Sequence, residues 1–443
     1  FQGAYEESLP RDGVVDTEGI RSDHTLEPAH ITKGRASTDV PKGAKMIHAG
    51  LCTHVDEWGP LPFFGHTVDG NQNGRTAVAE QLALLSKHVK PPKLTMYSDR
   101  GTFSAGHLAR LLAAGHDAVC AAPWGEFRPL FDEHRKSLTF KQASYLSIEQ
   151  QRRRKQNSEL PQEHYELAVL RHQITDDASR RVVPCRVIFV FSTADQKVVR
   201  VQRQKQIDRL TAGLDKIKTS VAEGRRNTTP EDVARRVARV YGKADAARYF
   251  SWEMIPLSKS EQAQLPKPKP GCKRPIHKFR FRLQRRLIRE DEQYDGYSSM
   301  VTTVPQNRGS ADSLFTQFKQ QIYSEQANSQ FKGPLAVRPV YLHSPKRVEA
   351  LVFLMMISLT AYYLLQRLYR QTVSPEAPLK EQRTTARTLK KAFNSYTLLI
   401  HHTRLGREVQ ATRLTTRQRT ILQRLGFPTP AQILSRRLPR APT

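Results

Sequence analysis

Two carboxylates have the position and surroundings to do chemistry, and the first is Asp99. The apolar run Leu94–Ser98 predicts a short buried strand that ends just before this residue. Ser104 then caps a predicted helix, and Asp117–Ala122 follows as a second strand. Asp99 is therefore expected at the carboxyl end of a strand, where ligands and metal ions collect in open α/β sheets. Taken alone, it is more readily explained as a turn cap or as the partner of the arginine beside it.

The second carboxylate is Glu325, in the polar segment Asp312–Lys332. We predict one helix over this whole segment, with apolar side chains spaced so that they share a face with Glu325: Leu314, Phe318 and Ile322. Glu325 then points toward whatever this apolar stripe packs against. Gly333 and Pro334 end the helix.

The charge of the chain limits what it can bind. Its 443 residues include 71 Lys and Arg against 42 Asp and Glu, a formal net charge of +29 that is spread along the sequence. A globular protein this positive requires a polyanionic partner, with nucleic acid first and an anionic membrane surface second. The four cysteines are far apart and form no CxxC pair, which argues against a zinc ribbon or a disulfide framework and favours the cytoplasm.

The predicted elements nearer the amino terminus follow the order of a known α/β architecture. Residues 6–43 read as a long surface loop after an extended segment at Phe1–Tyr5. Two strands, Ala44–Val55 and Leu61–Val68, form an antiparallel pair, and the helix Thr76–His88 comes next. Strand, strand, strand, helix, strand, helix, strand is the order of a ribonuclease-H-like mixed sheet, which is the fold class we predict.

A large basic segment, residues 125–309, interrupts this order, and we predict that it is a partly β insertion. Within it, the strand Lys278–Leu283 alternates basic and apolar residues, so its cations face outward and its Phe and Leu side chains face inward. A helix that opens at Thr229 carries further arginines. Such cations suit a phosphate backbone, and for the strand a solvated face is an equally good explanation. The candidate DNA-binding residues of the insertion are Arg235, Arg239, Arg280 and Arg282.

A long predicted helix from Ser344 to about Arg370 has an almost wholly apolar centre, Ala350–Leu365. This centre is shorter than the about 20 residues that span a bilayer, and cations flank it on both sides. We therefore predict a core helix buried in the protein and no membrane association. The remaining tail, residues 371–443, reads as basic and helical.

Together these features resemble the DDE transposases of bacterial insertion sequences, from Ala44 to about Arg370. The segment Tyr97–Gly101 is similar to the second acidic motif of that family, and Phe64–Asn71 to the turn before its first helix. In one branch of the family the third motif reads Tyr, two residues, Arg, three residues, Glu, six residues, Lys. At that spacing this sequence has Phe318, Gln321, Glu325 and Lys332, so the Tyr and Arg are replaced.

The resemblance implies an enzyme that cleaves DNA and transfers its strands at the ends of an insertion sequence. Such chemistry uses two Mg²⁺ (or Mn²⁺) ions about 4 Å apart, one at the attacking oxygen and one at the leaving oxygen. Asp99 and Glu325 would then be catalytic metal ligands, with Gln321 and Lys332 on the DNA backbone. The implied partners are double-stranded DNA and a second copy of the chain, and the implied location is the bacterial nucleoid.

The family also places an Asp on its first strand. Because Phe1–Tyr5 reads as the end of that strand, we expect this Asp to lie before Phe1, and the chain to be a truncated transposase with impaired activity. The nearby acids fall in the predicted loop and are poor substitutes: Asp12, Asp16 and Asp39.

The expected organisation has four parts. Residues 1–124 form the first part of the catalytic core, 125–309 the insertion domain, 310–370 the second part of the core, and 371–443 a helical carboxyl-terminal region. Two other classes of protein stay open. In a non-catalytic nucleic-acid-binding protein, Asp99 and Glu325 are surface or capping acids. In a membrane-associated basic protein, the apolar helix partitions into lipid.

Overall fold

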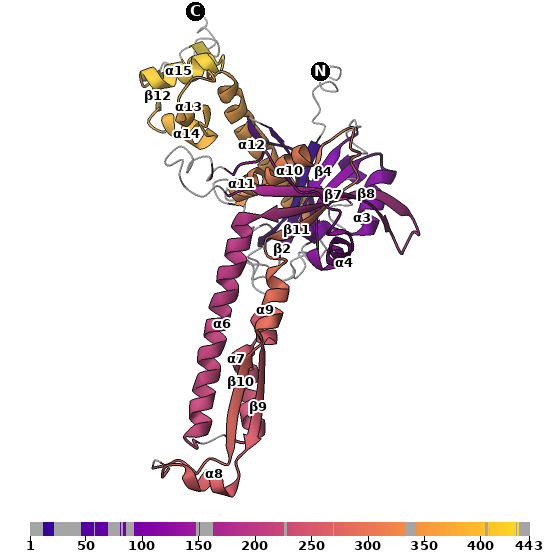
Figure 1. The fold of residues 1–443 in the computed structure, drawn as a ribbon. Coiled ribbons are helices and arrows are strands. Elements are labelled where there is room, and N and C mark those ends of the chain that lie inside the picture. The colour runs from indigo at the N-terminus through magenta and orange to yellow at the C-terminus, as the bar shows by residue number, and fades with distance from the viewer. Residues whose placement is uncertain are drawn as a thin grey trace, which may run out of the picture. The chain divides into compact units, whose positions relative to one another are not determined.

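A computed structural model describes residues 12–21, 46–56, 58–69, 80, 83–85, 93–147, 150, 163–225, 228–268, 270–332, 342, 344–403, 406–430 and 432–433. Its helices and strands are labelled in Figure 1. Within the predicted helix Thr76–His88, the described residues Glu80 and 83–85 are helical.

The strands are β1 (Asp12–Arg21), β2 (Met46–Asp56), β3 (Gly59–Asp69), β4 (Thr95–Ser98), β5 (Asp117–Ala122), β6 (Lys141–Gln142), β7 (Tyr165–Thr175), β8 (Val182–Ser192), β9 (Phe250–Pro256), β10 (His277–Leu283), β11 (Tyr297–Thr302), β12 (Leu398–Thr403) and β13 (Gly406–Ala411). The helices are α3 (Ala105–Ala113), α4 (Trp124–His134), α6 (Thr193–Ala222), α7 (Pro230–Tyr241), α8 (Lys259–Gln264), α9 (Arg285–Glu292), α10 (Ala311–Lys319), α11 (Gln321–Lys332), α12 (Pro345–Gln371), α13 (Leu379–Gln382), α14 (Ala386–Ala392) and α15 (Thr416–Arg424). Two 3-10 turns are η1 (Arg100–Thr102) and η2 (Asp245–Tyr249).

The chain folds into two compact units. The first comprises Phe1–Pro123, Leu170–Val187 and Met300–Thr443, and the second comprises Trp124–Val169 and Ile188–Ser299. Strands β7, β8 and β11 have residues in both units.

A mixed sheet joins nine strands in the order β3-β2-β1-β4-β5-β11-β8-β7-β6. β2 pairs antiparallel with both β1 and β3, whereas β4 pairs parallel with both β1 and β5. The chain therefore has a mixed α/β fold, as predicted. The antiparallel pair β2–β3 and the strands on either side of α3 are also confirmed.

The predicted loop over residues 6–43 is wrong for residues 12–21, which form β1 between β2 and β4. This segment mixes Val, Thr and Ile with three acids and two glycines, residue types that are depleted in strands. Pairing with a neighbour on each side stabilises it as a strand despite that composition. The extended segment predicted at Phe1–Tyr5 and the position of Asp39 lie outside the described residues.

Helix α12 packs through one face and exposes another. Its inner side chains form a cluster with Leu51 of β2 and Ala327 of α11: Val348, Val352, Met356, Leu359 and Tyr363. Its outer side chains are 40–61% exposed: Phe353, Leu354, Ile357, Leu364 and Leu368. By length and composition the helix could cross a membrane, and 28% of its most apolar stretch is buried. The prediction of a buried core helix is therefore correct for one face only.

The turn between β2 and β3 is tied to the end of α12 by charge. The Arg367 guanidinium donates to both carboxylate oxygens of Asp56, with 2.7 Å between Nη1 and Oδ1, and the Trp58 N–H donates to Oδ1 at 2.9 Å. Burial acts to raise the pKa of Asp56, but hydrogen bonds from His54 and Arg367, the Arg367 charge and the Trp58 N–H outweigh it and lower this pKa to about 2. Arg370 donates to the Trp58 carbonyl at 2.9 Å.

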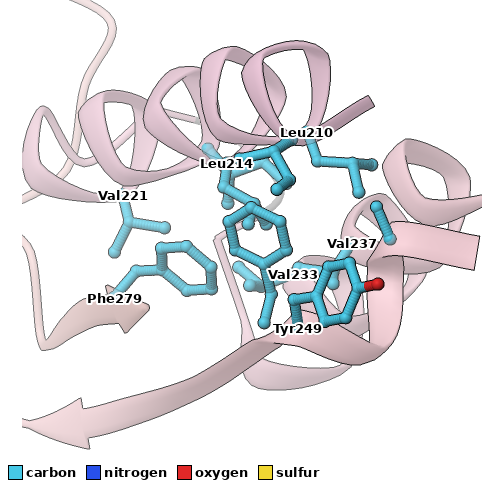
Figure 2. Packing of buried hydrophobic residues seen from close by; sticks show 11 residues of the cluster. Leu210, Leu214, Val221, Val233, Val237, Tyr249 and Phe279 are labelled. Atoms are coloured by element: carbon cyan, nitrogen blue, oxygen red, sulfur yellow. The ribbon is translucent and has the colours of Figure 1, made fainter. Parts of the chain in front are cut away.

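The second unit has an apolar core of its own, shown in Figure 2. Helix α6, about 45 Å long at 1.5 Å per residue, lies along the β9–β10 hairpin in Figure 1. The core is formed by side chains of α6, α7, η2 and β10: Leu210, Leu214, Val221, Val233, Val237, Tyr249 and Phe279. The alternation predicted for β10 is confirmed, because Phe279 is buried while Arg280 and Arg282 are exposed.

Two neighbouring residues fix the start of α6 within the second unit. The buried carboxylate of Asp295 accepts a hydrogen bond from Arg203 Nη1 at 2.8 Å, which helps to raise the pKa of this arginine. Gly296 has a φ of 83°, and a Cβ there would lie 2.6 Å from the Ser192 carbonyl oxygen at the N-cap of α6. Only glycine fits this close approach without a shift of backbone.

The tail, residues 371–443, is not wholly helical as predicted. An antiparallel hairpin, β12–β13, lies between α14 and α15. Leu389 of α14 and Ile421 of α15 pack with Tyr369 and Val373 in a small core. The short apolar run in β12 fits a helix or a strand equally well by periodicity, so its pairing across the turn decides its structure.

Candidate carboxylate site

Asp99 follows β4 and caps η1. Its Oδ1 accepts a hydrogen bond from the Thr102 N–H at 3.2 Å, and the Thr102 hydroxyl donates to the Asp99 carbonyl at 3.0 Å. A Cβ at Gly101 would lie 3.2 Å from the same Oδ1, so glycine lets the turn close around the carboxylate. Asp99 thus is a turn cap, but one N–H uses only one of the about four acceptor positions of a carboxylate. Because the side chain is exposed, the other positions can accept a ligand.

Asp16 lies on β1, the strand next to β4. The parallel register pairs Val14 with Tyr97. Continued by two residues, this register sets Asp16 beside Asp99, where β4 ends, and paired strands lie about 4.8 Å apart. Sequence reasoning set Asp16 aside because its segment was taken as a loop. The strand assignment reverses that judgement, because Asp16 is now on a strand beside the one that carries Asp99.

The segment that carries Glu325 is two helices, α10 and α11, and the prediction of a single helix is wrong. The break ends the predicted apolar stripe, because Leu314 is buried whereas Ile322 is 47% exposed. Glu325 is exposed in the second turn of α11. The helix packs through the buried Ala327 and lies against β1, β2 and β3. Glu325 is therefore on a helix that contacts the strand of Asp16.

A hydrogen bond joins β4 to the helix before α11. The Tyr97 hydroxyl donates to Oε1 of Gln317 on α10. Tyr97 lies two residues before Asp99 in sequence, and α11 follows α10 after one residue. The elements that carry Asp16, Asp99 and Glu325 are thus neighbours within the first unit: β1 pairs with β4, and α11 lies against β1.

The charge of Asp99 is felt on the next strand, β5. Cys120 is fully buried, with Sγ 3.1 Å from the Ser98 hydroxyl oxygen. Burial raises the pKa of the Cys120 thiol most, the hydrogen bond with Ser98 opposes the rise, and the Asp99 charge adds to it, giving a pKa of about 11. The thiol therefore stays protonated at neutral pH, which makes it a poor metal ligand and a poor nucleophile.

Three carboxylates are the donor set that a hard divalent cation prefers. Mg²⁺ is commonly bound through one or two carboxylates together with substrate phosphates, rather than in a cage made by protein alone. Among the residues whose side chains the structure describes, no three His, Cys, Asp or Glu lie close enough to hold a metal ion. Asp16 is described by its backbone only. The described donors, Asp99 and Glu325, fit a site that is completed by Asp16 and by substrate.

The other predicted site residues fall in two groups. Gln321 opens α11 and is half-buried, and Lys332 is the last residue of that helix. The predicted cations of the insertion lie in the second unit and are all exposed: Arg235 and Arg239 on α7, and Arg280 and Arg282 on β10. Arg235 pairs with Asp232 at 2.6 Å, and Arg280 approaches Glu253 at 3.8 Å. Exposed pairs of this kind are weak, so they do not prevent these arginines from binding a phosphate.

Comparison with known proteins gives one distant structural similarity. No family model and no curated protein matches the sequence. Among solved structures, one match is a piggyBac transposase, from a synaptic complex with hairpin DNA. Its TM-score is 0.32 at 7% sequence identity, and the match covers 95% of this chain but 59% of the transposase chain, less than two thirds of it. The similarity to a transposase is thus weak, and at this TM-score it carries no argument about mechanism.

Proposed function

We propose that the chain is a DDE transposase in which Asp16, Asp99 and Glu325 form one site for DNA strand cleavage and transfer. The observation that carries the proposal is the parallel register of β1 and β4, which sets Asp16 beside Asp99. The position of α11 against β1 supports a contribution from Glu325 to the same site. With Asp16 on a strand, the reason for expecting a missing Asp and an impaired enzyme no longer applies.

The strands that hold these acids support a ribonuclease-H-like core. Their order is β3-β2-β1-β4-β5, with antiparallel pairing from β1 to β3 and parallel pairing from β1 through β4 to β5. The predicted order of elements along the chain is the one that this arrangement requires. Acids at the end of β4 and beside it on β1 lie where such sheets collect ligands.

The carboxylates of Asp16, Asp99 and Glu325 would hold Mg²⁺ or Mn²⁺. The metal, when bound, would supply Lewis acidity to the scissile phosphodiester. On the same helix as Glu325, Gln321 and Lys332 would contact the DNA backbone and set the register of the strand. The exposed arginines of the second unit would hold the duplex through its phosphates: Arg235, Arg239, Arg280 and Arg282.

Nicking of supercoiled plasmid in the presence of Mg²⁺ tests this proposal. Asp99→Asn and Glu325→Gln remove a charged ligand and keep the side-chain shape, so each is expected to abolish nicking and to leave DNA affinity unchanged. Glu349→Gln, at an exposed carboxylate of α12, is the matched control and should nick like the wild type. Nicking that survives in both Asp99→Asn and Glu325→Gln would refute the proposal. DNA binding without nicking in wild type would favour the alternative, a non-catalytic nucleic-acid-binding protein.

We also propose that two copies of the chain associate through α12. Five residues repeat along it at alternating steps of three and four: Leu354, Ile357, Ala361, Leu364 and Leu368. All five are exposed, and this spacing is the apolar seam of paired helices. The same patch on two copies can meet around a twofold axis. The seam also borders a groove of about 430 Å³ that Phe63 and Phe64 of β3 help to line, which enlarges the apolar surface.

Sedimentation of the full chain tests the α12 interface. Wild type is expected to be a dimer at micromolar concentration, and Leu364→Glu a monomer, because it places a charge in the seam. Ser358→Glu adds the same charge at an exposed position of α12 outside the seam, and should leave the dimer intact. A wild-type monomer would refute this interface. Wild-type binding to neutral lipid vesicles that Leu364→Glu abolishes would instead favour a membrane role for the exposed face.

A further inference from the structure

A pocket of about 950 Å³ lies in the first unit between α14, α15, α12 and α11. Its lining carries four cations and, among the described residues, no Asp or Glu: Arg387, Lys390 and Lys391 of α14, and Arg417 of α15. Tyr362 of α12 and Gln330 of α11 lie on the other side. The pocket is therefore strongly positive on the side of the carboxyl-terminal helices.

The four cations have no counter-charge in the described part of the chain. All four side chains are exposed, and none makes an ion pair with a described residue. Arg424 of the same α15 shows the contrast, because it pairs with Glu381 at 2.6 Å. Like charges that share one cavity raise its potential and attract an anion, because nothing within the protein neutralises them.

The pocket also contains an unused hydrogen-bonding atom. Oε1 of Gln330 is buried, and no described residue provides it with a hydrogen-bond partner. A buried polar atom without a partner costs free energy unless a ligand or water satisfies it. Gln330 and the cations of α14 and α15 thus indicate independently that a polar ligand occupies this pocket.

We propose that this pocket binds the phosphodiester backbone of DNA. The pocket is near the upper limit of the 300–1,000 Å³ of small-molecule sites, so a single phosphate would fill only part of it. Its cations are spread over two helices, and on α14 Lys390 and Lys391 lie about one turn from Arg387. Spaced single cations match a chain of singly charged phosphates. The net charge of +29 favours a nucleic acid over a small anion as partner.

The pocket is a different site from the one formed by the carboxylates. Gln330 follows Glu325 by five residues, which places it about 7.5 Å further along the axis of α11 and about 140° around it. The inference rests on the DNA-binding part of the proposed function and is independent of its catalytic part. DNA held in the pocket would add phosphate contacts to those of the second unit.

Fluorescence anisotropy with a labelled DNA duplex tests the pocket, measured from low to moderate salt. Arg387→Gln with Arg417→Gln removes two pocket cations. It should lower affinity at least tenfold and reduce the slope of log K against log salt by about 2, one for each lost phosphate contact. The matched control is Arg413→Gln with Arg419→Gln, which removes two exposed arginines of the same region outside the pocket. It should change affinity by less than about twofold.

Three further measurements keep the inference falsifiable. Lys390→Gln with Lys391→Gln should reproduce the loss of affinity, and circular dichroism checks that every variant is folded. Equal losses in the pocket and control variants, or no loss in either, would overturn the inference. So would pocket variants that lose affinity for free triphosphate or for phosphatidylserine vesicles but keep their affinity for duplex DNA. If wild type fails to nick plasmid but the pocket variants lose DNA affinity, the catalytic proposal fails and this inference stands.

Discussion

Replacing Asp56 by Asn tests how α12 is held against the sheet. The carboxylate of Asp56 binds the guanidinium of Arg367 and the N–H of Trp58, so it connects the β2–β3 turn to the end of the helix. The amide keeps the shape of the side chain and removes the charge. The variant therefore reports the electrostatic part of this contact and little else.

The magnitude follows from the lowered pKa of Asp56, from 3.8 to about 2. Because this pKa is lower in the folded state, its stabilisation is full above the ordinary pKa and is lost as pH falls through about 2. A difference of almost two pKa units corresponds to about 2 kcal/mol. The Asp56 side chain is 24% exposed, so partial screening by water makes this an upper value.

Urea unfolding of wild type and Asp56→Asn over a pH series measures this contribution. The free energy of unfolding of the variant should be about 2 kcal/mol lower at neutral pH, and the difference should disappear as the pH falls from about 5 to 2. Asp177→Asn, at an exposed carboxylate of the same unit, should change stability by less than about 0.5 kcal/mol. A difference between Asp56→Asn and wild type that is constant with pH would refute the assignment to charge.

Two predictions concern the second unit. Phe279→Ala opens a cavity in the core of Figure 2 and should lower the free energy of unfolding by about 3–5 kcal/mol, whereas Arg282→Ala on the exposed face of the same strand should change it by less than about 0.5 kcal/mol. Gly296→Ala and Gly271→Ala both place a side chain at positive φ, but only at Gly296 does the new Cβ meet backbone, 2.6 Å from the Ser192 carbonyl. Thermal unfolding should show the larger loss for Gly296→Ala, and equal losses would contradict the close approach.

The parts of the fold that the sequence predicts best are those with a clear local pattern. β5 was predicted with the bounds that it has, because it is a run of small and apolar residues between turn signals. Ser104 and Thr229 were correctly identified as N-caps, because each hydroxyl accepts the N–H three residues on. In β10 the strict alternation of residue types was enough to assign its two faces.

The parts that could not be predicted depend on contacts that are distant in sequence. β1 is a strand because β2 and β4 pair with it, and no local signal outweighs its acids and glycines. The exposed face of α12 could not be told from a buried one by composition, because apolar residues surround the whole helix.

The same distinction separates the three acids of the candidate site. Asp99 and Glu325 could be proposed from a strand end and from motif spacing. Asp16 required the register between segments that are some eighty residues apart, although the apolar pair Val14–Val15 before it was a usable signal.

The measurement that tests a shared site most directly is a titration of Mn²⁺ into the full chain with a short DNA duplex, followed by the paramagnetic signal of free Mn²⁺. Wild type should bind Mn²⁺ saturably, and Asp16→Asn, Asp99→Asn and Glu325→Gln should each weaken this binding at least about tenfold. Asp12→Asn, on the same strand as Asp16, should bind like wild type. Wild-type affinity in Asp16→Asn would contradict the site, and so would equal affinity in all the variants.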